Sequence, residues 1–382
     1  MSRYKLRLRA CACLLFGTHF LSIPRALVQI MCGGMHYVTY APLCAAVSNA
    51  GGLGFLTAIT QPNPEKLREE IRKTRALTSR PFGVNISFLP AATPPDYDAY
   101  IKVLCASCLF LLPCSPHCAL TTAVYACAHN TSYTCVHEQV ILEENIKVVE
   151  TAGNNPGEYI KKIRAGGCDV IHKCTTIRHA ETAVKSGASW ISMDGFECAG
   201  HPGMADTGGL VLFAMAAKAF KERKINWIAS GGIGNGAQLA ACLALGAAGV
   251  NLGTRFMATV EAPIHQNIKQ ALVDGDNTQT TLILRSLKNT ERVYLNKMAL
   301  QAQAAENAKP GDISVIREYI AGSKYRVSFQ ETGNTQDSVW SCGQVMGLID
   351  DVPTCKVLMD GMVQDAISAF QAGSGMIVKS KL

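Results

Sequence analysis

Residues 225–256 read INWIASGGIGNGAQLAACLALGAAGVNLGTRF and decide the fold. Within this stretch, 225–230 is an apolar run that predicts a strand, and 237–245 predicts a helix. A second apolar run at 248–253 predicts another strand. Each run ends in glycines, and neither alternates polar with apolar residues. Such runs are typical of parallel strands that are buried on both faces.

The same alternation of strand and helix extends outward from this stretch. Further strands are predicted at 28–31, 53–58, 81–87, 146–152, 169–173 and 189–194. Helices are predicted at 41–50, 64–77, 156–165, 177–186, 209–221 and 262–273. Eight such units favour a closed (β/α)8 TIM barrel over 28–280. A doubly wound open sheet is the alternative, but no G-x-G-x-x-G fingerprint follows the first strand.

The length and composition fit one large barrel with an appended segment. The chain has 382 residues, of which 48% are hydrophobic and 17% charged, which excludes a disordered protein. Residues 1–64 carry five Lys and Arg and no acid, so they supply five of the seven net positive charges. The remainder is nearly neutral, which argues against a nucleic-acid surface. No apolar run is long enough to predict a membrane span.

Two segments depart from the barrel pattern. Residues 1–27 begin basic and turn apolar, as a targeting segment or an unstructured extension would. Residues 104–140 hold six of the 16 cysteines and interrupt what would otherwise be one helix joining 100–103 to 141–144. We interpret this stretch as an insertion into the helix, or as a translated non-coding stretch. Its cysteine spacing is too irregular to predict a metal site, and a reduced compartment is expected.

Residues 281–382 follow the barrel, and we expect them to pack on its mouth as a small segment rather than as a separate domain. A helical stretch is predicted at 288–306. The chain ends in Ser380, Lys381 and Leu382, a tripeptide that the peroxisomal import receptor reads as an address. A peroxisomal location is therefore predicted, with a cytoplasmic or mitochondrial one as the alternative.

Polar and small residues gather where the predicted strands end, which is where a barrel keeps its active site. They are Asn85, Lys173, Asp194, the loop 196–203, Ser230-Gly231-Gly232 and Gly253-Thr254. Glycines after two neighbouring strands let backbone N–H groups approach a phosphate, although they could serve the turns alone. His201 lies in a loop of small residues, where it suits a general base better than a structural role.

Several motifs together resemble the nitronate monooxygenase family, formerly called 2-nitropropane dioxygenases. The resemblance covers 28–103 and 141–365. The matching stretches are 47–54 (VSNAGGLG), 81–85 (PFGVN), 171–175 (IHKCT), 194–203 (DGFECAGHPG), 229–233 (ASGGI) and 249–256 (GVNLGTRF).

This resemblance implies a (β/α)8 barrel that binds FMN and needs neither a metal nor a nicotinamide. Residues implied to contact the flavin are Gly33, Gly34, Met35, Asn85, Lys173, Cys198, Ala199 and Gly200. Gly231, Gly232, Gly253 and Thr254 would hold the phosphate, and Asp194 and Ser230 complete the cofactor-binding set. His201 aligns with the catalytic base.

The implied reaction oxidises an alkyl nitronate with dioxygen to a carbonyl compound and nitrite. With a neutral nitroalkane, His201 would first remove the α-proton. Two alternatives stay open. One is an enoyl reductase-like enzyme that uses FMN and NAD(P)H. The other is a barrel that the insertion has made non-catalytic.

Overall fold

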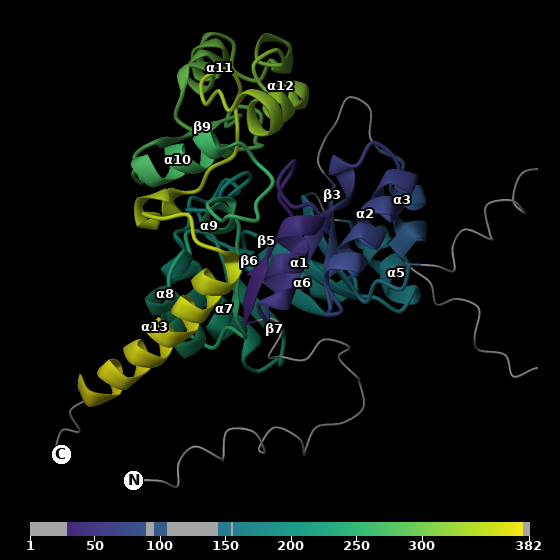
Figure 1. The fold of residues 1–382 in the computed structure, drawn as a ribbon, viewed down its shortest axis with the longest axis vertical. Helices are drawn as coiled ribbons and strands as arrows, with labels where there is room; N and C mark the ends of the chain where they lie inside the picture. Colours follow the sequence, from purple (N-terminus) through teal and green to yellow (C-terminus); the bar gives the residue numbers. More distant parts are fainter. Residues whose placement is uncertain (1–28, 89–94, 105–143, 154–155, 377–382) are drawn as a thin grey trace, which may run out of the picture.

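A closed barrel of eight parallel strands forms the body of the molecule (Figure 1). The computed structural model describes residues 29–88, 95–104, 144–153 and 156–376. Each strand pairs with the next along the chain, and β8 closes the barrel on β1 through the register Met31 to Asn251. The strands are β1 Ile30–Cys32, β2 Leu53–Thr57, β3 Gly83–Phe88, β4 Val148–Gly153, β5 Asp169–Cys174, β6 Trp190–Asp194, β7 Asn226–Ser230 and β8 Val250–Leu252. The TIM-barrel prediction is confirmed, and the open sheet is wrong.

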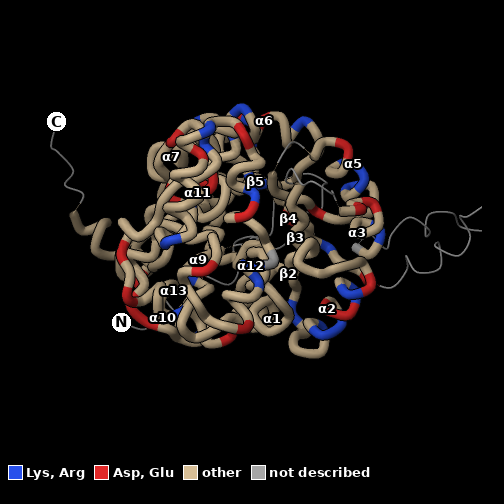
Figure 2. The backbone as a smooth tube through the Cα atoms, turned by 90° about the horizontal axis from the view of Figure 1, so that it is seen from above, with Lys and Arg blue, Asp and Glu red and all other residues tan. Residues whose placement is uncertain are grey.

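Helices surround the strands and carry most of the charged residues of the barrel around its outer ring (Figure 2). They are α1 Ala41–Asn49, α2 Pro64–Leu77, α3 Tyr97–Leu104, α5 Gly157–Ala165, α6 Ile177–Lys185, α7 Gly209–Phe220 and α8 Gly236–Ala244, followed by the shorter α9 Thr254–Met257 and by α10 Gln266–Asp274. Polar side chains cap the N-termini of several of these helices. The Asn63 side chain accepts a hydrogen bond from Lys66 N at the start of α2, and Asn235 does the same for Gln238 N at α8.

Three predicted elements differ from the structure. The helix expected at 262–273 begins only at Gln266, because the His265 side chain caps it by accepting from Asn267 N. The helix expected at 288–306 was wrong in its first part, since Glu291–Tyr294 pairs as β10 with β9 Thr280–Ile283. Helix α11 Lys297–Ala308 then starts at its Asn296 cap. Residues 100–103 are helical, but Glu144 is not, so the joined helix is absent from the described residues.

The interior of the barrel changes from apolar to polar along its axis. An apolar floor is built from Met31, Leu53, Phe55, Val148, Ile171, Trp190 and Ile228, none more than 2% exposed. Side chains of successive strands fill this floor, so the barrel is a packed core rather than a pore. Nearer the carboxyl ends of the strands, the inward side chains become carboxylates, amides and hydroxyls. The candidate site is therefore a polar layer resting on a dry floor.

Residues 280–349, here called the cap, lie over one side of the barrel mouth (Figure 1). The cap holds the β9–β10 hairpin and α11 around its own apolar cluster, which includes Ile283 and Val293, and it also holds α12 Gly322–Val327, whose Tyr325 packs against the main core. It joins the loop after β6 through paired backbone bonds between Gly200 and Arg292, of 3.1 Å and 2.6 Å. The cap thus forms one wall of the mouth.

The last described helix lies away from the barrel mouth. Helix α13 Cys355–Met376 runs down the outside of the barrel against α8 and α1 (Figure 1). This part of the chain after 280 packs on the barrel wall instead of on the mouth. No helix of the described residues is long and apolar enough to cross a membrane. The extension 1–27, the insertion cysteines and Ser380-Lys381-Leu382 lie outside the described residues, and the peroxisomal address stays a prediction.

The contact between α8 and α13 can be tested at Gly236. A Cβ there would lie 2.3 Å from the Met362 carbonyl oxygen, a distance that real Cβ atoms do not adopt. Gly236→Ala should therefore lower the free energy of unfolding by about 1–3 kcal/mol through overpacking, as urea denaturation would show. Gly361→Ala is the matched control, because a Cβ at that exposed position of α13 meets nothing within 4 Å. An equal loss in both variants would contradict the packing of α13 on α8.

Candidate active site

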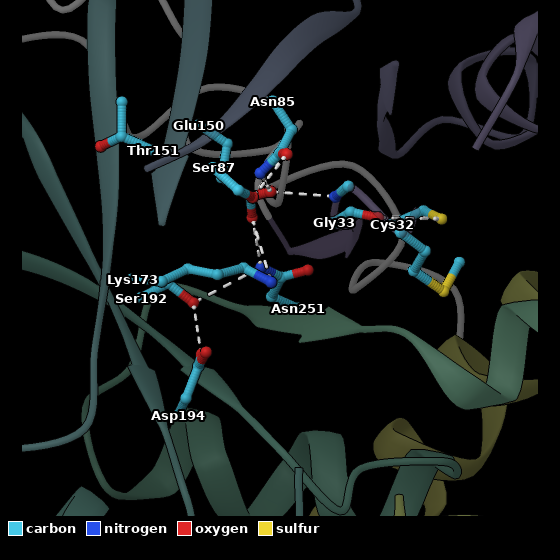
Figure 3. Close-up of polar contacts among 12 residues, drawn as sticks. Cys32, Gly33, Asn85, Ser87, Glu150, Thr151, Lys173, Ser192, Asp194 and Asn251 are labelled. Atoms are coloured by element: carbon cyan, nitrogen blue, oxygen red, sulfur yellow. Dashed lines mark hydrogen bonds and ion pairs between the residues drawn. The ribbon is translucent and has the colours of Figure 1, made fainter. Parts of the chain in front are cut away.

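The carboxylate of Glu150 is the centre of the polar layer (Figure 3). Glu150 lies on β4 and is fully buried. One carboxylate oxygen accepts hydrogen bonds from Gly34 N at 2.9 Å and from Asn85 Nδ2 at 2.7 Å. The other accepts from Asn251 Nδ2 at 2.8 Å and lies 3.6 Å from Lys173 Nζ. A buried charge is tolerated only with this degree of compensation.

Lys173 and Asp194 extend this layer toward the mouth. Burial alone would lower the pKa of Lys173, but the carboxylates of Glu150 and Asp194 outweigh it and hold the pKa above its ordinary value. Burial raises the pKa of Asp194, against the opposing effect of Lys173. Ser192 Oγ donates to Asp194 Oδ1 at 3.2 Å. The lysine therefore stays positive and presents a fixed cation, with 22% of its side chain exposed.

Close approach of backbone to this layer explains the glycines after β1. A Cβ on Gly34 would lie 2.2 Å from the Cβ of Asn85, and one on Gly33 would lie 2.6 Å from Asn251 Oδ1. Both positions therefore require glycine. The backbone of the β1 loop lies directly on the polar layer, as the sequence predicts for residues that contact a cofactor.

The glycines in the loops after β7 and β8 differ from those after β1 in backbone conformation and surroundings. Gly231 and Gly232 have φ of +91° and +74°, in the left-handed region that favours glycine. A Cβ on Gly253 would meet only the Met35 side chain, with the sulfur at 3.5 Å, so the backbone there faces open space and the β1 loop. Thr254 Oγ1 accepts from Gly343 N of the cap at 3.0 Å, which leaves its hydroxyl hydrogen free to donate.

The loop after β6 brings His201 to the mouth. Its Nδ1 lies 3.1 Å from the Thr290 carbonyl oxygen and 3.3 Å from that of Asn289. Carbonyl oxygens only accept, so the hydrogen-bond network assigns the proton to Nδ1 and leaves the Nε2 lone pair free. The cap therefore fixes the tautomer that a general base requires.

Beside His201, a cavity of about 950 Å³ opens over β5 and β6. Of the predicted site residues, it is lined by Lys173, Asp194, Ala199 and His201. Cys198 is buried next to them, and burial raises the pKa of its thiol, so the thiol is neutral. Gly200, at the cap contact, has a φ of +72°. Met35, Asn85, Ser230 and the phosphate-loop glycines do not line this cavity. The predicted site residues therefore form two groups. His201 and Lys173 lie at the cavity with Asp194 and Ala199, and the residues expected to hold the cofactor phosphate lie outside its lining.

Several site residues escaped the sequence prediction. Glu150, Asn251 and Ser192 form the layer, yet none was singled out. Their signal was present: Glu150 follows Val148 and Val149 in an apolar run, which is the same signal that marks Lys173. A charged or amide side chain inside a buried barrel strand points to the interior network. No group of three or more metal-ligating side chains occurs among the residues that the structure describes.

His172 is a further buried side chain that was missed. It is 4% exposed, lines the cavity, and its Nδ1 lies 2.8 Å from Thr151 Oγ1 on β4. Burial lowers its pKa from 6.5 to about 4, with the Thr151 contact opposing. Burial alone lowers the pKa of His36, on the β1 loop, to about 4 as well. Both rings are neutral when the protein is folded at neutral pH.

Glu150 gives the first prediction for this site. Glu150→Gln keeps the shape of the side chain but removes the charge and places an amide N–H₂ against N–H donors. We expect a loss of about 3–5 kcal/mol in the free energy of unfolding, because a buried cation loses its partner. Urea denaturation measures it. Glu158→Gln makes the same change on an exposed helix face and should have a much smaller effect. Equal stabilities of Glu150→Gln and wild type would contradict this network.

A second prediction concerns acid stability. Because the folded pKa of His172 lies below its unfolded value, the unfolded state takes up the proton first as the pH falls. The contribution of this histidine is complete above about pH 6.5 and is lost between 6.5 and about 4. Its slope approaches about 1.4 kcal/mol per pH unit. His172→Asn, which keeps a polar atom near Thr151, should flatten the stability profile in this window.

The control for that experiment is His179→Asn, the same change at an exposed position of α6. Unfolding free energies measured from pH 7 to pH 4 should show a much shallower slope for His172→Asn, whereas His179→Asn, which removes only a minor charge effect on the pKa of His172, should change the slope little. Parallel profiles for wild type and His172→Asn would show that His172 is not held neutral by burial.

Comparisons with known proteins identify relatives of this chain. The family model described as "Nitronate monooxygenase" matches residues 18–365. A nitronate monooxygenase of Paraburkholderia phytofirmans is 28% identical over 348 residues, covering 88% of this chain and 91% of that protein. A (3aS,4S,5R,7aS)-5-hydroxy-7a-methyl-1-oxo-octahydro-1H-indene-4-carboxyl-CoA dehydrogenase of Rhodococcus jostii is 27% identical over 390 residues, covering 93% and 96%.

Among solved structures, FabK from Thermotoga maritima superposes with a TM-score of 0.74 and 27% identity, covering 92% of this chain and 96% of that one. The structure of a nitroalkane oxidase from Streptomyces ansochromogenes has a TM-score of 0.66 at 24% identity and supports the fold. The family match spans most of the chain, including the polar layer, the glycine loops and His201. The chain belongs to the nitronate monooxygenase family of oxidoreductases.

Proposed function

We propose that this protein binds FMN at the barrel mouth and oxidises alkyl nitronates with dioxygen to a carbonyl compound and nitrite. The observation that carries the proposal is the position of His201. Its Nδ1–H is held by the cap carbonyls, so Nε2 is free at a cavity that Lys173 also lines. A base and a buried cation at one cavity suit a substrate that is a carbon acid or its anion.

The residues beside the cavity fit a flavin phosphate. Gly231 and Gly232 hold left-handed backbone, and the backbone at Gly253 faces open space with the Thr254 hydroxyl beside it. Such loops let backbone N–H groups and a hydroxyl approach a phosphate. Gly34, Asn85 and Lys173, on the polar layer, would contact the cofactor. When bound, FMN supplies the redox chemistry between substrate and dioxygen.

The side chains of this chain position the substrate and move its proton. Lys173 stays charged, because Glu150 and Asp194 hold it so, and attracts the anionic nitro group of a nitronate. With a neutral nitroalkane, His201 Nε2 accepts the α-proton. The positive charge that His201 then gains is stabilised by its Nδ1–H bond to the Thr290 carbonyl oxygen. A nitronate is already deprotonated and does not need this step.

A second candidate function is an FMN-dependent reductase that takes hydride from NAD(P)H. It is favoured by the similarity of the chain to a carboxyl-CoA dehydrogenase and to FabK at the same level of identity as to nitronate monooxygenases. Anaerobic mixing of the purified protein with each donor separates the two. Bleaching of the flavin absorbance by propyl-2-nitronate supports the first function, and bleaching by NADPH alone supports the second.

The role of His201 gives a direct prediction. In His201→Asn, the amide can still donate to the cap carbonyls but offers no base. Turnover of neutral 2-nitropropane should fall by at least about 100-fold, the usual contribution of a general base. Oxidation of the preformed nitronate and the flavin content should change little, as absorbance and nitrite assays would show. Undiminished turnover of the neutral nitroalkane would contradict the assigned role.

A further inference from the structure

The cavity beside His201 extends well beyond the reacting groups. At its inner end lie the half-buried Lys173, Asp194 and His201. At its open end lie three exposed side chains, Arg178 and His179 from α6 and Lys288 from the cap. A volume of about 950 Å³ is at the top of the range for sites that take drug-sized ligands. A short alkyl nitronate fills only the inner end.

Among the described residues that line the open end of the cavity, no carboxylate neutralises the positive charge. Asp194 is the sole carboxylate among the described residues that line the cavity, and it lies beside Lys173 at the inner end. Arg178 and Lys288 make no ion pair within the described ranges. Arg285, three positions before Lys288, differs in that Asp206 neutralises it. One cation of α6 and one of the cap therefore line this cavity without an ion pair among the described residues.

Hydrogen bonds of the residues on either side of Lys288 in the sequence fix its position in the wall of the cavity. Arg285 binds Asp206 through two parallel hydrogen bonds, of 3.1 Å and 2.9 Å, which fasten the cap to the loop after β6. On the other side, the Thr290 carbonyl oxygen accepts from His201 Nδ1. Lys288 lies between these anchors with φ of +55°, a conformation that a non-glycine residue adopts rarely. Its backbone position is thus set by the same contacts that orient the base.

We propose that the open end of the cavity is an anion subsite, in which Arg178 and Lys288, with His179, bind a phosphate group on a long substrate. Two cations match a phosphate monoester, whose charge is about −1.5 to −2, better than a single carboxylate. Arginine and lysine both bind phosphate, the first through paired N–H donors. The hydroxyls of Thr175, Thr176 and Thr182 also line this cavity. The substrate class is then a carbon acid attached to a phosphate-bearing handle, as in acyl-coenzyme A thioesters.

This inference deepens the proposed function, since the reacting carbon of such a substrate reaches His201 at the inner end. Short alkyl nitronates are then minimal substrates that occupy the inner end alone. Binding of the handle itself depends only on the cations of the open end, so it can be measured without turnover.

The test is calorimetric titration of the flavin-loaded protein with coenzyme A, which presents the phosphates without an acyl group, at fixed ionic strength. We expect a dissociation constant below about 1 mM. In the double variant Arg178→Gln/Lys288→Gln, binding should weaken at least tenfold. Lys218→Gln/Lys221→Gln, the α7 control, removes two exposed charges in and directly after the last turn of α7, outside the cavity, and should leave binding unchanged. Thermal unfolding of each variant verifies that it is folded.

The outcomes separate this proposal from the proposed function. Absence of coenzyme A binding, or an equal loss in the α7 control, overturns the anion subsite even when propyl-2-nitronate is oxidised. Binding that requires Arg178 and Lys288 establishes the subsite even when no nitronate is oxidised, and in that case the nitronate function fails alone.

Discussion

The structure depends most on one buried carboxylate. Glu150 takes hydrogen bonds from the loop after β1, from β3 and from β8, and it lies next to the lysine of β5. In the closed barrel β3 and β5 flank β4, whereas the β1 loop and β8 reach Glu150 across the interior, which pairing of β8 with β1 encloses. A charge buried to this extent is stable only while all its partners stay in place. The polar layer of the site can therefore form only when the barrel is closed.

The chemistry follows from what this constraint fixes. Glu150 and Asp194 keep Lys173 charged, and the cap holds His201 in one tautomer. The apolar floor excludes water from the barrel interior beneath the polar layer. The strands supply the fixed charges, whereas the loop after β6 and the cap supply His201 and much of the cavity wall. The cap and α6 line the cavity without contributing to the network of Glu150 below it.

Much of the fold could be predicted from the sequence because buried parallel strands leave apolar runs that need no partner to be recognised. The polar layer could not be assembled this way. Glu150 and Asn251 lie 101 positions apart, and their contact depends on closure. Local patterns also misled at 288–306, where the predicted helix begins with a strand that its hairpin partner and the loop after β6 stabilise. His201 could be singled out from its loop, but its tautomer required the cap.

The most direct measurement is the identity and amount of the small molecule that the purified protein releases on denaturation, by mass spectrometry and visible absorbance. A polar layer and glycine loops that form one cofactor site predict one FMN per chain. No flavin after reconstitution with FMN, or a flavin other than FMN, would contradict the central claim that this barrel mouth is an FMN site.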